Sequence, residues 1–206
     1  MKNYEELYYI VDELYDENTL YLTALEKSAQ RRYSSIRLEL GGEPLFFENA
    51  YREEDKSSNK IRPIKKSHMN MTNLLVNEAL KNKLDVFAIQ NFQFYPSIII
   101  DDYDSYHEDF WIMNIFGSID ALDCDTSEIK RFKPDNDSNK VIRYSLNSEL
   151  LDSIPEERRL IFRMPNTEHK TIFVHEKIVD IFKEEGVDNI KFHKISEWYR
   201  GKQFQA

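Results

Sequence analysis

The chain of 206 residues has little of what stabilises small secreted proteins or marks a membrane protein. Its one cysteine, Cys124, excludes an internal disulfide framework and suits a reducing compartment. Only five Gly and six Pro are present, which argues against an architecture dominated by loops. The first residues lack the apolar segment of a signal peptide, and the longest apolar runs are far too short to span a bilayer. These absences predict a globular, cytoplasmic protein.

Lysine and arginine are absent from one central stretch, residues 85–129. These 45 residues carry ten of the 37 carboxylates, whereas the rest of the chain has 27 acidic and 28 basic residues. The net charge of −9 therefore comes from this one stretch. A field of this sign repels nucleic acid and attracts cationic partners. Ordinary solvation of an acidic surface is the alternative interpretation.

Runs rich in alternating, β-branched or aromatic residues predict a chain built mainly of strands. These strands are expected at residues 7–11, 36–40, 86–89, 97–100, 141–144 and 160–164, and Pro44 opens a further apolar stretch at 45–47. The most apolar run, residues 110–119, fits either a strand that bends at Gly117 or a buried helix, and we favour the strand. Residues 19–32 fit either a short helix or a strand, and the charged segment 52–66 is expected to be an exposed loop.

Two helices are expected among these strands. Thr72 or Asn73 can cap a helix over residues 73–82, which has a leucine-rich face. A second helix is expected to begin after His175 and to end at Gly186, a residue that tolerates a left-handed C-cap.

The second helix lies between expected strands at 171–174 and 189–192. This β-α-β tail, following several strands, predicts an α+β fold with a largely antiparallel, partly mixed sheet and a few packing helices. Residues 1–206 are expected to form a single domain. A polar break at 133–139 is the place where it would subdivide.

Residue patterns of the common catalytic classes are missing. No Ser lies in the Gly-x-Ser-x-Gly turn of hydrolases, and no glycine-rich loop has the spacing that cradles a phosphate. Cys124 lies between Asp123 and Asp125, whose carboxylates disfavour a reactive thiolate. The sequence therefore predicts a protein that is not an enzyme and has no cofactor.

The cluster of carboxylates at residues 101–109 is the best candidate for metal binding. A calcium loop of the EF-hand type needs Gly at its sixth position and Glu at its twelfth. Counted from Asp101, these positions hold Tyr106 and Ile112, so the register fails. We predict no metal site, although a metal-dependent enzyme that uses this cluster stays open as an alternative.

The same cluster combines carboxylates with aromatic rings, a composition suited to a protein interface. Rings supply contact area, and carboxylates steer a basic partner into position. The candidate contact residues are Asp101, Asp102, Tyr103, Asp104, Tyr106, Glu108, Asp109, Asp125 and Glu128. Core rings next to solvated loop charges are the alternative explanation.

The apolar segment DFWIMNI, residues 109–115, resembles the signature of a bacterial immunity-protein family. It is followed by an Ile-Asp-x-Leu-Asp step at residues 119–123 and by Ser127, as in that family. The segments at 160–163, 172–174 and 186–192 are similar to the family's C-terminal strand, helix and Gly-to-Phe ending. The resemblance extends over residues 80–195, and Asn189 departs from it because the family has a small residue there.

This family is number eleven among the immunity domains of polymorphic toxin systems. The resemblance implies a cytoplasmic bacterial protein that is encoded beside a secreted or contact-delivered toxin and protects the producing cell. It carries over no catalytic residue. Asp120 and Asp123 match the motif and fit either a functional role or the capping of a turn.

Charge, aromatics and resemblance together predict an inhibitor that binds a cognate toxin. We expect the acidic, aromatic-bearing surface to cover a basic active-site cleft, such as that of a nuclease, and we expect no nucleic-acid or membrane partner. A general protein-interaction module unrelated to toxins is the remaining alternative.

Overall fold

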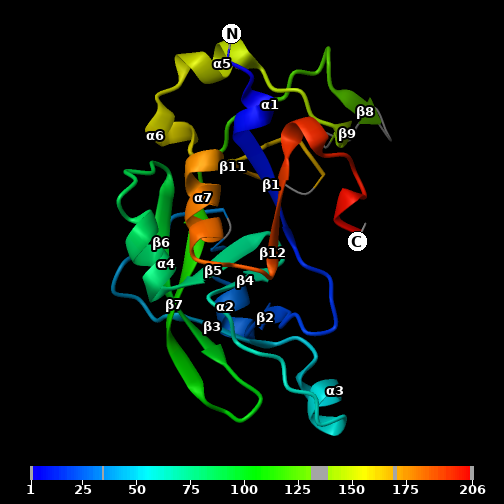
Figure 1. Cartoon of the computed structure of the whole chain (residues 1–206). Coiled ribbons are helices and arrows are strands. Elements are labelled where there is room, and N and C mark those ends of the chain that lie inside the picture. Colours follow the sequence, from blue (N-terminus) through cyan, green and yellow to red (C-terminus); the bar gives the residue numbers. More distant parts are fainter. Residues whose placement is uncertain (1, 34, 131–138, 169–170, 205–206) are drawn as a thin grey trace.

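The computed structural model describes residues 2–33, 35–130, 139–168 and 171–204 (Figure 1). The larger of two main sheets has six strands, in the order β2 (Leu22–Ala24), β3 (Leu45–Asn49), β6 (Phe92–Ile100), β7 (Tyr106–Ile115), β5 (Asn73–Asn77) and β4 (Ser67–Asn70). The smaller sheet has the order β10 (Ile161–Arg163), β11 (Ile172–His175), β1 (Tyr8–Glu13) and β12 (Ile190–Lys194). A separate two-stranded ribbon consists of β8 (Glu128–Lys130) and β9 (Lys140–Arg143).

Strand pairing in the two main sheets is antiparallel except between β3 and β6, which run parallel. The α-helices are α1 (Tyr4–Leu7), α2 (Glu26–Ala29), α3 (Arg52–Ser57), α4 (Glu78–Leu84), α5 (Ser148–Ser153), α6 (Glu156–Arg159) and α7 (Glu176–Glu184). Two 3₁₀ turns follow near the end of the chain, η1 (Ile195–Glu197) and η2 (Lys202–Phe204). The predicted α+β fold with a largely antiparallel, partly mixed sheet is confirmed.

The strands β1, β5 and β11 are buried on both faces over four successive residues each, which explains their nearly continuous apolar runs. In β1, Tyr9 and Val11 join an apolar cluster shared by the two sheets, whereas Tyr8 and Ile10 join a cluster on the opposite face. In the larger sheet, the buried side chain of Leu75 belongs to a third cluster. Helices α4 and α7 contribute to the shared cluster and contact each other. The fold therefore alternates apolar layers with sheets.

The β-α-β tail agrees with the prediction from the sequence. His175 ends β11 and caps α7, because its Nδ1 accepts the backbone N–H of Lys177 at 3.3 Å. Gly186 follows the helix with a φ of +66°, a conformation in which a Cβ would be strained. Predicted strands at 7–11, 97–100, 141–144, 160–164 and 171–174 also overlap observed strands, and the apolar stretch 45–47 lies in β3.

The predicted strand at residues 36–40 is wrong. No strand is present there, and Ile36 and Leu40 are largely exposed while Leu38 is buried. Side-chain amides take the place of a neighbouring strand. Gln93 bonds to both the N–H and the carbonyl of Leu38, at 2.7 and 3.1 Å, and Asn114 donates to the carbonyl of Ile36 at 2.8 Å.

The predicted helix over 73–82 is also wrong in its first half. Residues 73–77 form β5, because the three apolar residues 74–76 are buried on both faces of the sheet. The helix α4 begins only at Glu78. Its cap is Asn77, whose side chain accepts the N–H of Leu80 at 3.1 Å.

Two further predictions need correction. The segment 52–66 contains the helix α3, and its Asp55 is buried rather than exposed. Residues 86–89 form no strand but connect α4 to β6. The ambiguous stretch 19–32 contains both elements considered for it, the strand β2 and the helix α2. The polar break at 133–139 lies outside the described residues except for Asn139.

No described helix has the length and apolar character needed to cross a membrane.

Candidate functional site

The acidic and aromatic candidates gather at the tip of the hairpin formed by β6 and β7, at the bottom of Figure 1. The tip is a tight turn between Asp101 and Ser105, whose backbone N–H and carbonyl pair at 3.0 Å. Asp104 has a φ of +63°, a left-handed conformation that Asp adopts more readily than most residues. The hairpin therefore projects a short, defined loop.

Asp101 shapes this turn. Its Oδ1 accepts the backbone N–H groups of Tyr103 and Ser105, each at 2.9 Å, and its Oδ2 lies 3.1 Å from Nε2 of His107. Partial burial raises the pKa of Asp101, but the N–H groups and His107 outweigh it, so that the pKa lies below its ordinary value. The carboxylate of Asp101 is thus already engaged within the turn.

Asp102 and Asp104 connect the hairpin to α3 and the end of β3. The amide of Asn49 donates to both oxygens of Asp102, at 3.2 and 3.3 Å. Arg52 pairs with Asp104 at 2.5 Å and with Glu48 at 3.1 Å, and this guanidinium lowers the pKa of Asp104. These contacts connect the loop to α3 and to the end of β3.

A buried ion pair anchors α3 in turn. The guanidinium of Arg62 donates to both carboxylate oxygens of Asp55, at 2.5 and 3.2 Å. It also donates to the carbonyls of Glu17 and Thr19. Asp55 is only 3% exposed, and Asn49 donates to it at 2.8 Å. The segment 52–66 is therefore a support for the hairpin.

Four of the candidate residues on the hairpin have exposed side chains, and these side chains do not hold the turn. Tyr103 and Tyr106 are 70% and 60% exposed. Glu108 and Asp109 are exposed on β7, where the register shifts so that these two residues oppose Ile98 alone. Such a bulge twists a strand and turns side chains outward. We call Tyr103, Tyr106, Glu108 and Asp109 the hairpin surface.

The structure does not bring Asp125 and Glu128 to the hairpin surface. They lie in and beside β8, at the opposite end of the molecule in Figure 1. Glu128 is 3.8 Å from Arg143 across the two-stranded ribbon. The neighbouring Asp123 caps a turn, because its Oδ1 accepts the backbone N–H groups of Asp125 and Thr126 at 3.0 and 3.3 Å. Asp123 therefore has the structural role that the motif left open.

A hollow beside the hairpin was not predicted from the sequence. Its volume is about 210 Å³, and residues 61–64 line one side while Asp101, Asp102 and His107 line the other. The largely exposed Ile61 lies at this hollow, so apolar surface adjoins the acidic turn. The two sides are separated by about 40 residues of sequence, and no local pattern indicated that they meet.

Comparison with known families gives an identification. A family model described as Immunity protein family (Imm11) matches residues 20–197. The chain belongs to this family. The match is wider than the resemblance at residues 80–195. It includes both the hairpin of β6 and β7 and the segment 52–66 that supports it. Membership in Imm11 indicates an immunity function. No curated protein matches the chain.

The described residues contain no cluster of side chains arranged as a metal site. No three His, Cys, Asp or Glu side chains there are grouped so that they could hold a metal ion. Within the acidic cluster, Asp101, Asp102 and Asp104 are instead bonded to the turn, to Asn49 and to Arg52.

Proposed function

We propose that this Imm11 protein binds a cognate bacterial toxin in the cytoplasm and blocks it by covering the toxin's active site with the hairpin surface. The observation that carries the proposal is the exposure of two tyrosines and two carboxylates on one anchored hairpin. Tyrosines are frequent anchors of protein interfaces because they bury a large ring and retain a polar end. No catalytic step is required of the inhibitor.

Rigidity of the hairpin favours tight binding. A loop that must be ordered on association loses conformational entropy, and this loss weakens the complex. Here Asp101 holds the turn, and Arg52 and Asn49 hold the turn against α3. The hairpin surface is thereby presented in one arrangement before the partner arrives.

Charge favours fast capture. Five carboxylates lie between Asp101 and Asp109, a segment without Lys or Arg, and Arg52 from α3 pairs with one of them, Asp104. Glu108 and Asp109 are exposed and carry the charge of the hairpin surface. Opposite charge on a partner raises the association rate far more than it raises the final affinity. An antidote to a catalytic toxin needs such speed, and the partner we propose is therefore a toxin with a basic active-site cleft.

Co-expression with the protein encoded by the adjacent reading frame tests this function. The wild-type chain is expected to rescue growth and to co-purify with that protein. The double variant Tyr103→Ala/Tyr106→Ala is expected to lose rescue, because it removes both exposed rings without touching the bonds that hold the turn. Phe204→Ala is the matched control, since Phe204 is a ring of similar exposure, 72%, away from the hairpin.

The outcomes separate function from site. If the wild-type chain neither rescues growth nor co-purifies, the immunity function toward that neighbour is refuted. If rescue persists in the folded double tyrosine variant, the toxin binds elsewhere and the hairpin surface is not the inhibitory site. Circular dichroism of each purified variant establishes that it is folded.

A further inference from the structure

The hollow beside the hairpin has one wall that belongs to the hairpin surface itself. Tyr103, a residue of that surface, lines the hollow and is 70% exposed. On the side formed by residues 61–64 lies Ile61, which is 67% exposed. Small-molecule pockets usually exceed about 300 Å³. The volume of about 210 Å³ therefore suits a single side chain of a partner protein better than a separate ligand.

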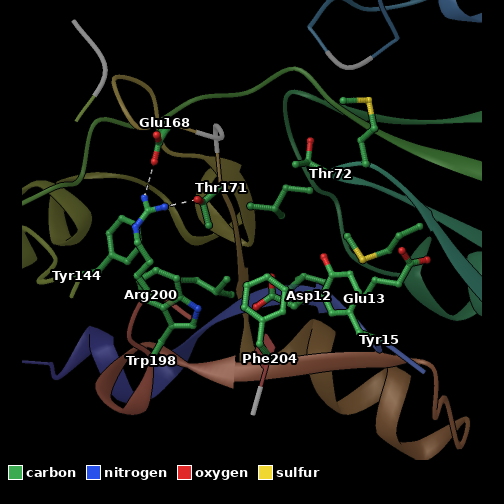
Figure 2. Close-up of a pocket in the computed structure, with 15 residues that line it drawn as sticks. Asp12, Glu13, Tyr15, Thr72, Tyr144, Glu168, Thr171, Trp198, Arg200 and Phe204 are labelled. Atoms are coloured by element: carbon green, nitrogen blue, oxygen red, sulfur yellow. Dashed lines mark hydrogen bonds and ion pairs between the residues drawn. The ribbon is translucent and has the colours of Figure 1, made fainter. Parts of the chain in front are cut away.

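A larger cavity, of about 410 Å³, lies at the end of β1 and does not adjoin the hairpin in this way (Figure 2). Tyr15 and Phe204 line it, with ring centroids 5.5 Å apart, and Arg200 on its wall pairs with Glu168 at 2.9 Å. Its described lining residues include none of the hairpin surface. Of these two cavities, the hollow is therefore the one that can take part in the proposed toxin contact.

The floor of the hollow is part of the apolar core. Leu20 lines the hollow and is only 5% exposed, and it belongs to the buried cluster of the larger sheet that also contains Leu75. Ile64, also in the lining, is partly buried and packs against the same cluster. An apolar side chain that enters the hollow would therefore extend an existing core, and this burial of apolar surface is favourable.

Hydrogen bonds hold the wall formed by residues 61–64, although these residues form neither a helix nor a strand. Arg62 donates to the carbonyl of Thr19 at 2.9 Å. The N–H of Lys65 donates to Nε2 of the buried His68, also at 2.9 Å. A wall that is bonded to the fold at two points needs less ordering when a partner binds, and this favours affinity.

The charged side chains around the hollow are already bonded within the fold. Arg62 pairs with Asp55, and Asp101 accepts two backbone N–H groups of the turn. Both carboxylate oxygens of Asp102 accept from the amide of Asn49. The surface that remains for a partner is mainly apolar, and it belongs to Leu20, Ile61, Pro63 and Ile64.

We propose that the hollow receives one large apolar side chain of the toxin, a Leu, Ile, Met or Phe that projects from the toxin's basic surface. This inference rests on the proposed function and adds to it the kind of residue that the toxin contributes. Binding energy in protein interfaces is concentrated in a few side chains that fill such pockets, inside a rim of polar contacts that excludes water. Here the hairpin surface forms the rim, and its exposed Glu108 and Asp109 meet the basic groups of the toxin.

Binding kinetics with the purified protein encoded by the adjacent reading frame test this inference. Ile61→Ala is expected to raise the dissociation rate by about tenfold or more and to leave the association rate near that of wild type, because it removes an apolar wall and no charge. The matched control is Leu40→Ala, since Leu40 is 70% exposed and belongs to neither the hollow nor the hairpin surface. Its dissociation rate should equal that of wild type.

Alanine variants of the neighbouring protein identify the occupant of the hollow. Replacement of one of its exposed large apolar residues should weaken binding to the wild-type chain by about tenfold or more, but should weaken binding to Ile61→Ala much less, because the effects of residues in contact are not additive. Asp102→Asn removes a charge at the hollow and keeps an acceptor for Asn49. It should leave the dissociation rate unchanged if the occupant is apolar.

Two results would overturn this inference and leave the proposed function in place. The first is a dissociation rate of Ile61→Ala equal to that of wild type or of Leu40→Ala, in a complex that Tyr103→Ala/Tyr106→Ala disrupts. The second is faster dissociation of Asp102→Asn than of Ile61→Ala, which would identify a cationic occupant. If the wild-type chain does not bind the neighbouring protein at all, the proposed function toward that protein fails and this inference fails with it.

Discussion

Replacing Asp12 by Asn is expected to make the protein more stable above pH 7. The carboxyl of Asp12 has a pKa of about 6 in the folded chain, against an ordinary value of 3.8, chiefly because burial disfavours its charged form. The folded state therefore binds the proton more tightly than the unfolded state does. Stability from this group is complete below pH 3.8 and is lost as the pH rises through 6.

The size of the effect follows from the difference in pKa. A difference of about two units corresponds to about 3 kcal/mol, at about 1.4 kcal/mol per unit. The side chain of Asp12 is 23% exposed, and solvent screening reduces this value to about 2 kcal/mol. Asparagine resembles the protonated acid, so Asp12→Asn should gain this amount at pH 8 and almost nothing at pH 4.

Urea denaturation followed by tryptophan fluorescence measures this gain. A difference of about 2 kcal/mol shifts the midpoint by about 1 M urea for a chain of this size. Comparison of variant with wild type at each pH cancels the other titrating groups, including His68 and His175, whose pKa values burial lowers to about 4. A midpoint shift that is equal at pH 4 and pH 8, or a loss of stability at pH 8, would refute the reasoning.

Two more stability effects follow from the structure, and the same assay measures both. Arg62→Ala should lower the free energy of unfolding by about 3 kcal/mol, because it leaves the buried carboxylate of Asp55 without its ion-pair partner. A loss below about 1 kcal/mol would show that water or a neighbouring group replaces Arg62. Gly117→Ala should lower the free energy of unfolding by about 1–3 kcal/mol, because a Cβ there would lie 2.7 Å from the Cβ of Asn91. An unchanged urea midpoint would show that the backbone at Gly117 shifts without loss of stability. We also propose that residues 1–206 are one domain, and we expect a single transition because both main sheets share one apolar cluster.

The parts of the fold that were predictable are those governed by local pattern. The strand–helix–strand tail has apolar runs at 171–174 and 189–192, an apolar stripe on the helix between them, and Gly186 at the end of the helix, so its elements followed from sequence alone. The predictions at 36–40 and 73–82 failed because distant groups decided the outcome. Gln93 replaced a neighbouring strand for Leu38, and burial on both faces made residues 74–76 a strand.

The candidate site was likewise predictable only in part. Composition located the acidic, aromatic segment 101–109, but it did not distinguish exposed side chains from those that hold the turn. Asp101 and Asp102 are bonded within the fold, whereas Glu108 and Asp109 are exposed. The cavity at the end of β1 was not predicted at all, because it combines the end of β1 with residues near the C-terminus, and only the tertiary structure joins them.

The most direct test of toxin capture by the hairpin surface is the association rate with the purified cognate toxin at low salt. Glu108→Gln/Asp109→Asn removes one Glu and one Asp from the hairpin, and Asp125→Asn/Glu128→Gln removes the same pair from the β8 region. We predict that the first variant associates about tenfold more slowly, with a weaker salt dependence, and that the second associates like wild type. Equal rates for the two variants, or slowing by the second alone, would contradict capture by the hairpin surface.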